Sequence, residues 1–127
     1  MFVQAHVLPP PLERIANTPV LASEMPPGFT RAKIVRLAPN AKLGTLGGVR
    51  IDFINAHTTE SESFALMKTS AAAGFFAQTE MKIDGGSLFH VRARAVGRFV
   101  VGATGRTVSE ATDLLRLALA HFHRSGA

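Results

Sequence analysis

The chain contains no cysteine, no tyrosine and no tryptophan. The absence of cysteine excludes disulfide bonds, thiol nucleophiles and thiolate-bound metals, and it is in keeping with the cytoplasmic location that we expect. The absence of tyrosine removes one kind of general acid and leaves nine phenylalanines to supply the aromatic packing. We expect neither a cofactor nor a metal site.

Long apolar runs are also missing. No stretch approaches the roughly 20 residues that cross a bilayer, and residues 1–6 lack the basic and apolar regions of a signal peptide. With 127 residues, 46% of them hydrophobic, we expect one core and no membrane span. The net charge is +5, and ten of the fourteen basic residues are arginine, which suits bidentate contacts with carboxylate or phosphate.

The C-terminal forty residues carry the clearest structural signals. Residues 88–95 and 98–103 are predicted strands, joined by a turn at residues 96–97. Thr107 and Glu110 have the spacing of a capping box, which predicts that a helix begins there. One apolar face follows at three- and four-residue steps, formed by Ala111, Leu114, Leu115, Ala118 and Phe122.

The remainder of the chain divides into an irregular N-terminal arm with a short helix, residues 1–28, and an α+β domain, residues 29–127. Predicted strands cover residues 29–37, 49–53 and 64–69, with a polar turn at residues 57–62. Residues 75–83 alternate in polarity and favour a strand that ends in an Asp-Gly-Gly turn, although the alanines of residues 70–78 also suit a helix. The expected fold is an antiparallel five- to six-stranded meander sheet with one apolar face, on which the long C-terminal helix packs.

The order of these elements resembles two known families. An early strand, short helices, a meander and a long final helix are similar to the helix-grip (START-like) fold, and a sheet ending in a strand and a helix resembles the PsbP and Mog1-like group. The first resemblance implies a ligand cleft between the sheet and the helix, or an enzyme that acts by pocket shape with few catalytic groups.

Catalytic and cofactor motifs are weak. Residues 102–107 (Gly-Ala-Thr-Gly-Arg-Thr) resemble a dinucleotide fingerprint, but Val108 occupies the third glycine position and no ribose-binding segment follows, so we expect a capped strand-to-helix loop. His121 and His123 are two residues apart and do not share the helix face that a metal requires. Asp52 with His90 is the one acid–base pair worth testing.

Two sets of residues are candidate sites, and neither is catalytic. A basic face could bind an anion, with Arg50 and Arg98 as neighbours; its members are His90, Arg92, Arg94 and Arg106. Apolar side chains on the sheet and final helix could line a pocket: Phe75, Met81, Phe89, Phe99 and Leu115.

We therefore expect a non-enzymatic binding module, either for an apolar small molecule between sheet and helix or for a protein partner, including a homodimer. The alternatives are a helix-grip-type enzyme for a small apolar substrate and an anion or nucleic-acid binder. Nucleic acid is the less favoured anion, because no aromatic side chain clearly shares the basic face to stack on bases.

Overall fold

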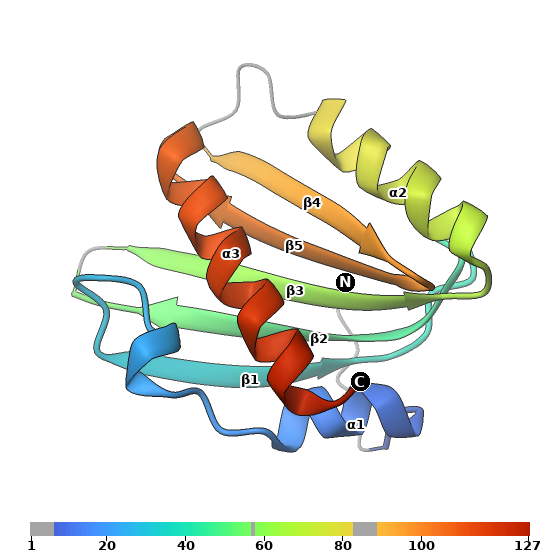
Figure 1. Cartoon of the computed structure of the whole chain (residues 1–127), viewed down its shortest axis with the longest axis horizontal. Coiled ribbons are helices and arrows are strands. Elements are labelled where there is room, and N and C mark those ends of the chain that lie inside the picture. Colours follow the sequence, from blue (N-terminus) through green and yellow to red (C-terminus); the bar gives the residue numbers. More distant parts are fainter. Residues whose placement is uncertain (1–6, 57, 83–88) are drawn as a thin grey trace.

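The computed structural model describes residues 7–56, 58–82 and 89–127, and for residues 79–82 it describes the backbone alone. The N-terminal segment contains helix α1 and a short 3₁₀ helix η1, and three strands, helix α2, a hairpin and helix α3 follow (Figure 1). The bounds are α1 Pro10–Asn17, η1 Ala22–Glu24, β1 Arg31–Leu37, β2 Thr45–Ile54, β3 Thr59–Met67, α2 Ser70–Lys82, β4 His90–Val96, β5 Phe99–Gly105 and α3 Val108–Ser125.

The described strands form one antiparallel sheet in the order β1-β2-β3-β5-β4. The predicted α+β fold, with a five-stranded antiparallel sheet and a C-terminal helix, is confirmed. The meander itself runs only from β1 to β3. Strand β5 then pairs with both β3 and β4, so the connection through α2 passes over β5 before the β4–β5 hairpin returns the chain.

The prediction of a strand at residues 75–83 is wrong as far as Lys82, because these residues belong to helix α2. Residue 83 and the Asp-Gly-Gly turn lie outside the described residues. Thr69 caps the helix, because its side-chain oxygen accepts a hydrogen bond from the Ala72 amide at 3.0 Å. Ala73 and Ala77, four residues apart, are 0% and 6% exposed. This small buried pair lets the helix approach the sheet closely, and it outweighs the alternation of polarity that favoured a strand.

Strand β3 corrects a second prediction, the polar turn at residues 57–62. The strand begins at Thr59, so Glu60 and Glu62 lie within it, and their side chains are 4% and 1% exposed. Charged residues are almost never so buried unless they are paired, which is why their charge suggested a turn.

The main core lies under α3. Strand residues of β2, β3 and β5 that point to this face pack against Leu114, Ala118 and Phe122 of the helix, which crosses the sheet (Figure 1). The rings of Phe99 and Phe122 meet edge to face with their centroids 5.0 Å apart. Helix α1 belongs to the same core, because Leu12 and Ile15 are fully buried in it.

The sheet is apolar on its second face as well, where a single apolar face was predicted. Alternate residues of β4 and β5 pack there against α2, in a cluster of Met67, Ala73, Ala77, Ala93 and Val100. Most of these side chains are small, and α2 covers chiefly the β4–β5 side of the sheet. The candidate site lies on this face of the sheet, toward β2 and β3.

Candidate functional site

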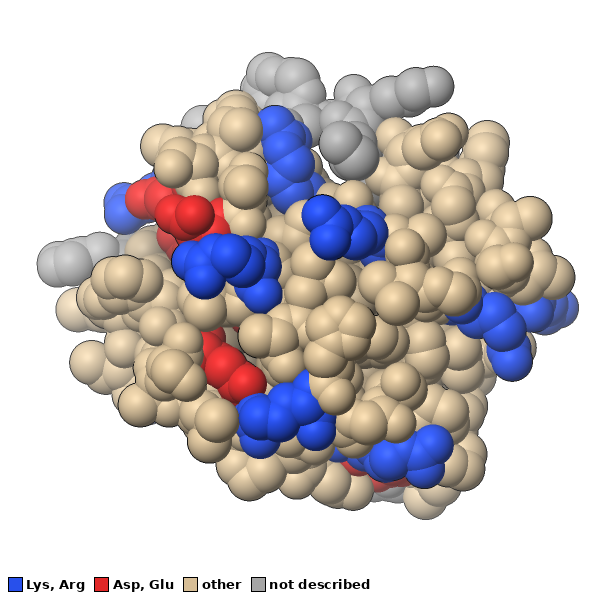
Figure 2. Space-filling model, in the orientation of Figure 1, with Lys and Arg blue, Asp and Glu red and all other residues tan. Residues whose placement is uncertain are grey.

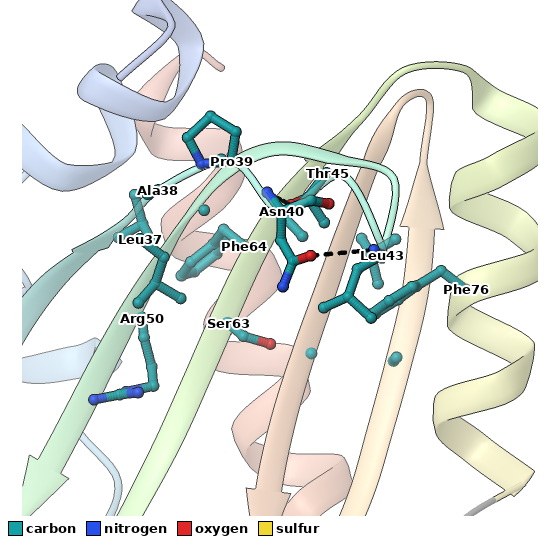
Figure 3. A pocket seen from close by; sticks show the side chains of 17 residues that line it. Leu37, Ala38, Pro39, Asn40, Leu43, Thr45, Arg50, Ser63, Phe64 and Phe76 are labelled. Atoms are coloured by element: carbon teal, nitrogen blue, oxygen red, sulfur yellow. Dashed lines mark hydrogen bonds between the residues drawn. The ribbon is translucent and has the colours of Figure 1, made fainter. Parts of the chain in front are cut away.

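A pocket of about 400 Å³ lies on the sheet face opposite α3 (Figure 3). Its floor is formed by β2, β3, β4 and β5, and its walls by Phe76 of α2 and by the β1–β2 connection, residues 38–44. The sequence predicted a pocket between the sheet and the C-terminal helix, whereas this pocket lies on the other side of the sheet.

The pocket is hollow because the residues that form its floor have small side chains. Register places Gly48 beside Ala65, and Ser63 beside Gly102, while Ala93 pairs with Gly102 from the other side. Since cross-strand partners point to the same face, these residues form two adjoining rows without a large side chain between them. A Cβ atom on Gly102 would lie 2.7 Å from the Ser63 Oγ, so this glycine provides the room that the serine occupies.

The outer wall is a loop held by Asn40. The Asn40 Oδ1 accepts hydrogen bonds from the backbone amides of Lys42 at 3.1 Å and Leu43 at 3.4 Å, and Gly44 takes a positive φ of 75° to return the chain. The amide of Asn40 in turn donates to the Thr45 hydroxyl at 3.0 Å. This network places Leu43 at the mouth of the pocket, next to Phe76 (Figure 3).

The polar lining consists of few groups. Arg50 is the one charged residue among the described residues that line the pocket, and its Nε donates to Asp52 at 2.8 Å. The Ser61 hydroxyl also donates to Asp52, at 2.7 Å. The positive charge is therefore partly balanced at the pocket edge, while the other lining is mostly apolar.

No protein-family model, curated protein or solved structure matches this chain. The interpretation of the pocket therefore depends on its geometry and chemistry alone.

The predicted apolar ligand residues lie elsewhere in the structure. Phe99 is in the core beneath α3, and Leu115 is half-buried against that core. Phe75 is 73% exposed on α2, and Phe89 is 43% exposed before β4. The side chain of Met81 is outside the described residues. None of these four described side chains is part of the pocket lining. Sequence reasoning missed the residues that do line the pocket, because the small residues of its floor form no periodic pattern.

Three of the predicted anion-binding residues do share a face. His90, Arg92 and Arg94 alternate along β4 on the α3 side of the sheet, and His90 pairs with Gly105, next to Arg106 in the chain. Arg50 is on the opposite face, and Arg106 lies 3.9 Å from the carboxylate of Glu110. Figure 2 shows separate basic groups on the α3 side, rather than one continuous basic surface.

The candidate acid–base pair is not assembled. Asp52 is on β2 and His90 is on β4, with β3 and β5 between them. Their side chains also point to opposite faces of the sheet, because Asp52 extends beside Arg50 and Ser61 on the pocket side. The structure therefore gives this pair no shared site.

The glycine-rich loop before α3 has a packing role. A Cβ atom on Gly105 would lie 2.5 Å from the Ala111 backbone nitrogen, so the glycine lets the helix start close against β5. Thr107 caps the helix through a 3.0 Å hydrogen bond from the Glu110 amide, and the Glu110 carboxylate accepts from the amide of Arg106. The capped loop that we expected here is what the structure contains.

A buried charged cluster joins the N-terminal segment to α3, and sequence reasoning missed it. Glu24 of η1 accepts hydrogen bonds from Arg124 Nε at 2.7 Å and lies 3.1 Å from Nδ1 of His121, whose Nε2 faces the carbonyl oxygen of Ile15. Both ring nitrogens of His121 thus face acceptors. Hydrogen bonding from Arg124, above all, lowers the pKa of Glu24 to about 2.

Glu62 has the opposite environment. Its Oε2 has no hydrogen-bond partner among the residues that the structure describes, and burial, with a smaller contribution from the charge of Glu24, raises its pKa to about 9. The side chain points to the α3 face, away from the pocket. It is a buried acid in the core and is not part of the candidate site.

Two classes of site find no support in the described residues. Within residues 7–56, 58–82 and 89–127, no group of histidine, aspartate and glutamate is arranged to hold a metal ion. None of the helices in these ranges is both long enough and apolar enough to span a membrane.

Proposed function

We propose that this protein is a non-enzymatic binding module for a small, largely apolar molecule, which it holds in the pocket opposite α3. The observation that carries the proposal is the floor of small residues, Gly48, Ala65, Ala93 and Gly102, which leaves a hollow beneath Leu43 and Phe76. Its volume of about 400 Å³ is within the range of roughly 300–1,000 Å³ that is usual for ligand sites.

The lining supports an apolar occupant. Leu37, Leu43 and Phe76 supply accessible apolar surface, and a ligand that covers it gains about 25 cal/mol for each Å² removed from water. Because an uncovered apolar hollow on one face of the sheet is costly in water, a molecule of complementary shape is favoured there.

The proposal is tested by filling the pocket from its floor. Ala65 lies on β3, is half-buried and lines the pocket, so Ala65→Leu places a larger side chain in the cavity. Ala32→Leu is the matched control, because Ala32 is an exposed strand residue outside the lining. Thermal unfolding of both variants verifies that they are folded.

The probe is the neutral fluorescent dye Nile red, titrated into the purified full-length chain. We expect saturable binding of one dye per chain, weakened by about tenfold or more in Ala65→Leu and unchanged in Ala32→Leu. Native mass spectrometry of the freshly purified protein is the second measurement, and a retained small molecule that is lost in Ala65→Leu supports the proposal. Dye binding that does not saturate, or that Ala65→Leu leaves unchanged, would overturn it.

A further inference from the structure

The polar groups of the pocket indicate what the bound molecule must offer. We propose that the ligand carries a hydrogen-bond acceptor oxygen, a carboxylate or a carbonyl, which binds Asn40 and Ser63 while its apolar body lies against Leu43, Phe76 and Val100. This inference rests on the proposed function, because it concerns the same pocket.

Asn40 presents a donor to the pocket. Two backbone amides, those of Lys42 and Leu43, donate to its Oδ1, so the orientation of the side-chain amide is determined by the loop. The remaining group is the Nδ2, and Figure 3 shows it directed into the pocket. No hydrogen bond engages this nitrogen within the described part of the chain, so its two hydrogens remain available to a ligand.

Ser63 presents a hydroxyl from the floor. Its side chain is exposed on the pocket face, and in the described ranges its Oγ takes part in no hydrogen bond. Gly102 opposite leaves the space in which this hydroxyl lies, since a Cβ atom there would be 2.7 Å away. In the proposed complex, this hydroxyl donates to the same acceptor oxygen that binds the Asn40 amide.

The other polar groups at the pocket favour the same chemistry. The Thr45 hydroxyl is already engaged with the Asn40 backbone, at 3.0 Å from its nitrogen. Arg50 contributes the positive charge of the lining, although Asp52 offsets part of it. A ligand that offers an acceptor meets the donors of Asn40 and Ser63, whereas an amine would place its own N–H groups against the Asn40 amide.

The experiment compares three ligands with the same chain and different polar ends: octanoate, methyl octanoate and octylamine. The measurement is the displacement of bound Nile red from the full-length protein by each ligand at neutral pH. We expect octylamine to bind at least about tenfold more weakly than octanoate. Stronger binding of octanoate than of methyl octanoate identifies a carboxylate, and equal binding identifies a neutral carbonyl as sufficient.

The decisive variant is Asn40→Asp. An aspartate retains the oxygen that accepts from Lys42 and Leu43, so the loop is kept, but it replaces the donor in the pocket with a charged acceptor. We expect the preference for octanoate over octylamine to be lost or inverted. Ser63→Ala should weaken the binding of octanoate by several-fold. The control is Asn17→Asp, which adds the same charge on α1 and retains the oxygen that accepts from Arg36, outside the pocket.

The outcomes separate this inference from the proposed function. Equal displacement by octanoate and octylamine, or an unchanged preference in Asn40→Asp, overturns the acceptor ligand even when Ala65→Leu still weakens dye binding. Dye binding that Ala65→Leu leaves unchanged overturns the pocket itself, whatever the order of the three ligands.

Discussion

At the scale of single residues, the buried carboxylates of Glu62 and Glu24 respond to pH in opposite ways. Burial raises the pKa of Glu62 to about 9, from an ordinary value of 4.5. Its contribution to stability is therefore fully present below pH 4.5 and is lost as the pH rises toward 9, because over that range the unfolded chain releases a proton that the folded chain retains.

We expect the free energy of unfolding of Glu62→Gln to rise relative to that of the wild type across this interval, by up to about 1.4 kcal/mol per pH unit. Urea unfolding at a series of pH values between 5 and 9 measures the difference. Parallel pH dependences in the two proteins would show that Glu62 is already ionised in the folded state.

Glu24 stabilises the fold over a different interval. Since Arg124 and His121 lower its pKa to about 2, its contribution is present above pH 4.5 and is lost as the pH falls through 2. We expect Glu24→Gln to lower the free energy of unfolding at pH 7 by about 3 kcal/mol. The loss should shrink steadily as the pH falls from 4.5 to 2 and be small at pH 2, which urea unfolding at pH 7 and at pH 2 would reveal; an equal loss at both pH values contradicts the assignment.

At the scale of elements, α3 is held by one face and by its cap. Leu114 is 1% exposed, whereas Leu115 is only half-buried. We expect Leu114→Ala to cost roughly 2–5 kcal/mol and Leu115→Ala to cost less, because truncation of a fully buried leucine leaves a cavity. Chemical unfolding of both variants gives the comparison, with the exposed Arg116→Ala as the control. The reverse order of the two leucines would mean that the helix is rotated about its axis.

The cap of α3 contributes a smaller amount. Thr107 Oγ1 accepts the Glu110 amide at 3.0 Å, and Thr107→Ala removes this bond. The expected loss is about 1 kcal/mol, measured by thermal or urea unfolding. Thr107→Ser, which retains the acceptor, should recover most of it, and an unchanged stability in Thr107→Ala would place the start of the helix elsewhere.

At the scale of the whole molecule, the N-terminal segment closes the core. Leu12 and Ile15 are 0% exposed, and Glu24 binds Arg124 and His121 near the end of α3. We expect deletion of residues 1–28 to uncover apolar surface, so that the truncated chain aggregates or dimerises and binds an apolar dye more strongly. Size-exclusion chromatography and dye fluorescence measure this. A truncated chain that stays monomeric, with unchanged dye binding and stability, would show that the sheet is closed without the segment.

Local patterns in the sequence determined the C-terminal hairpin and α3. Val96 pairs with Phe99 around Gly97, which has a φ of 58°, and Thr107 caps α3. Both features depend on residues that are neighbours in the chain, so they can be predicted without knowledge of the fold. The same kind of pattern was insufficient for α2, where the alternation from residue 75 competes with the spacing of Ala73 and Ala77. Packing of those alanines against β4 and β5 decided in favour of the helix.

The candidate site was decided by tertiary structure alone. Gly48, Ser63, Ala93 and Gly102 are small residues far apart in the sequence, and the local pattern around each of them does not indicate a pocket. Strand register brings them side by side, and the turn at Asn40 then places Leu43 above them. A cavity depends on which side chains are absent across several strands, and this property exists only after the strands have paired. The burial of Glu62, on the face of β3 that α3 contacts, has the same origin.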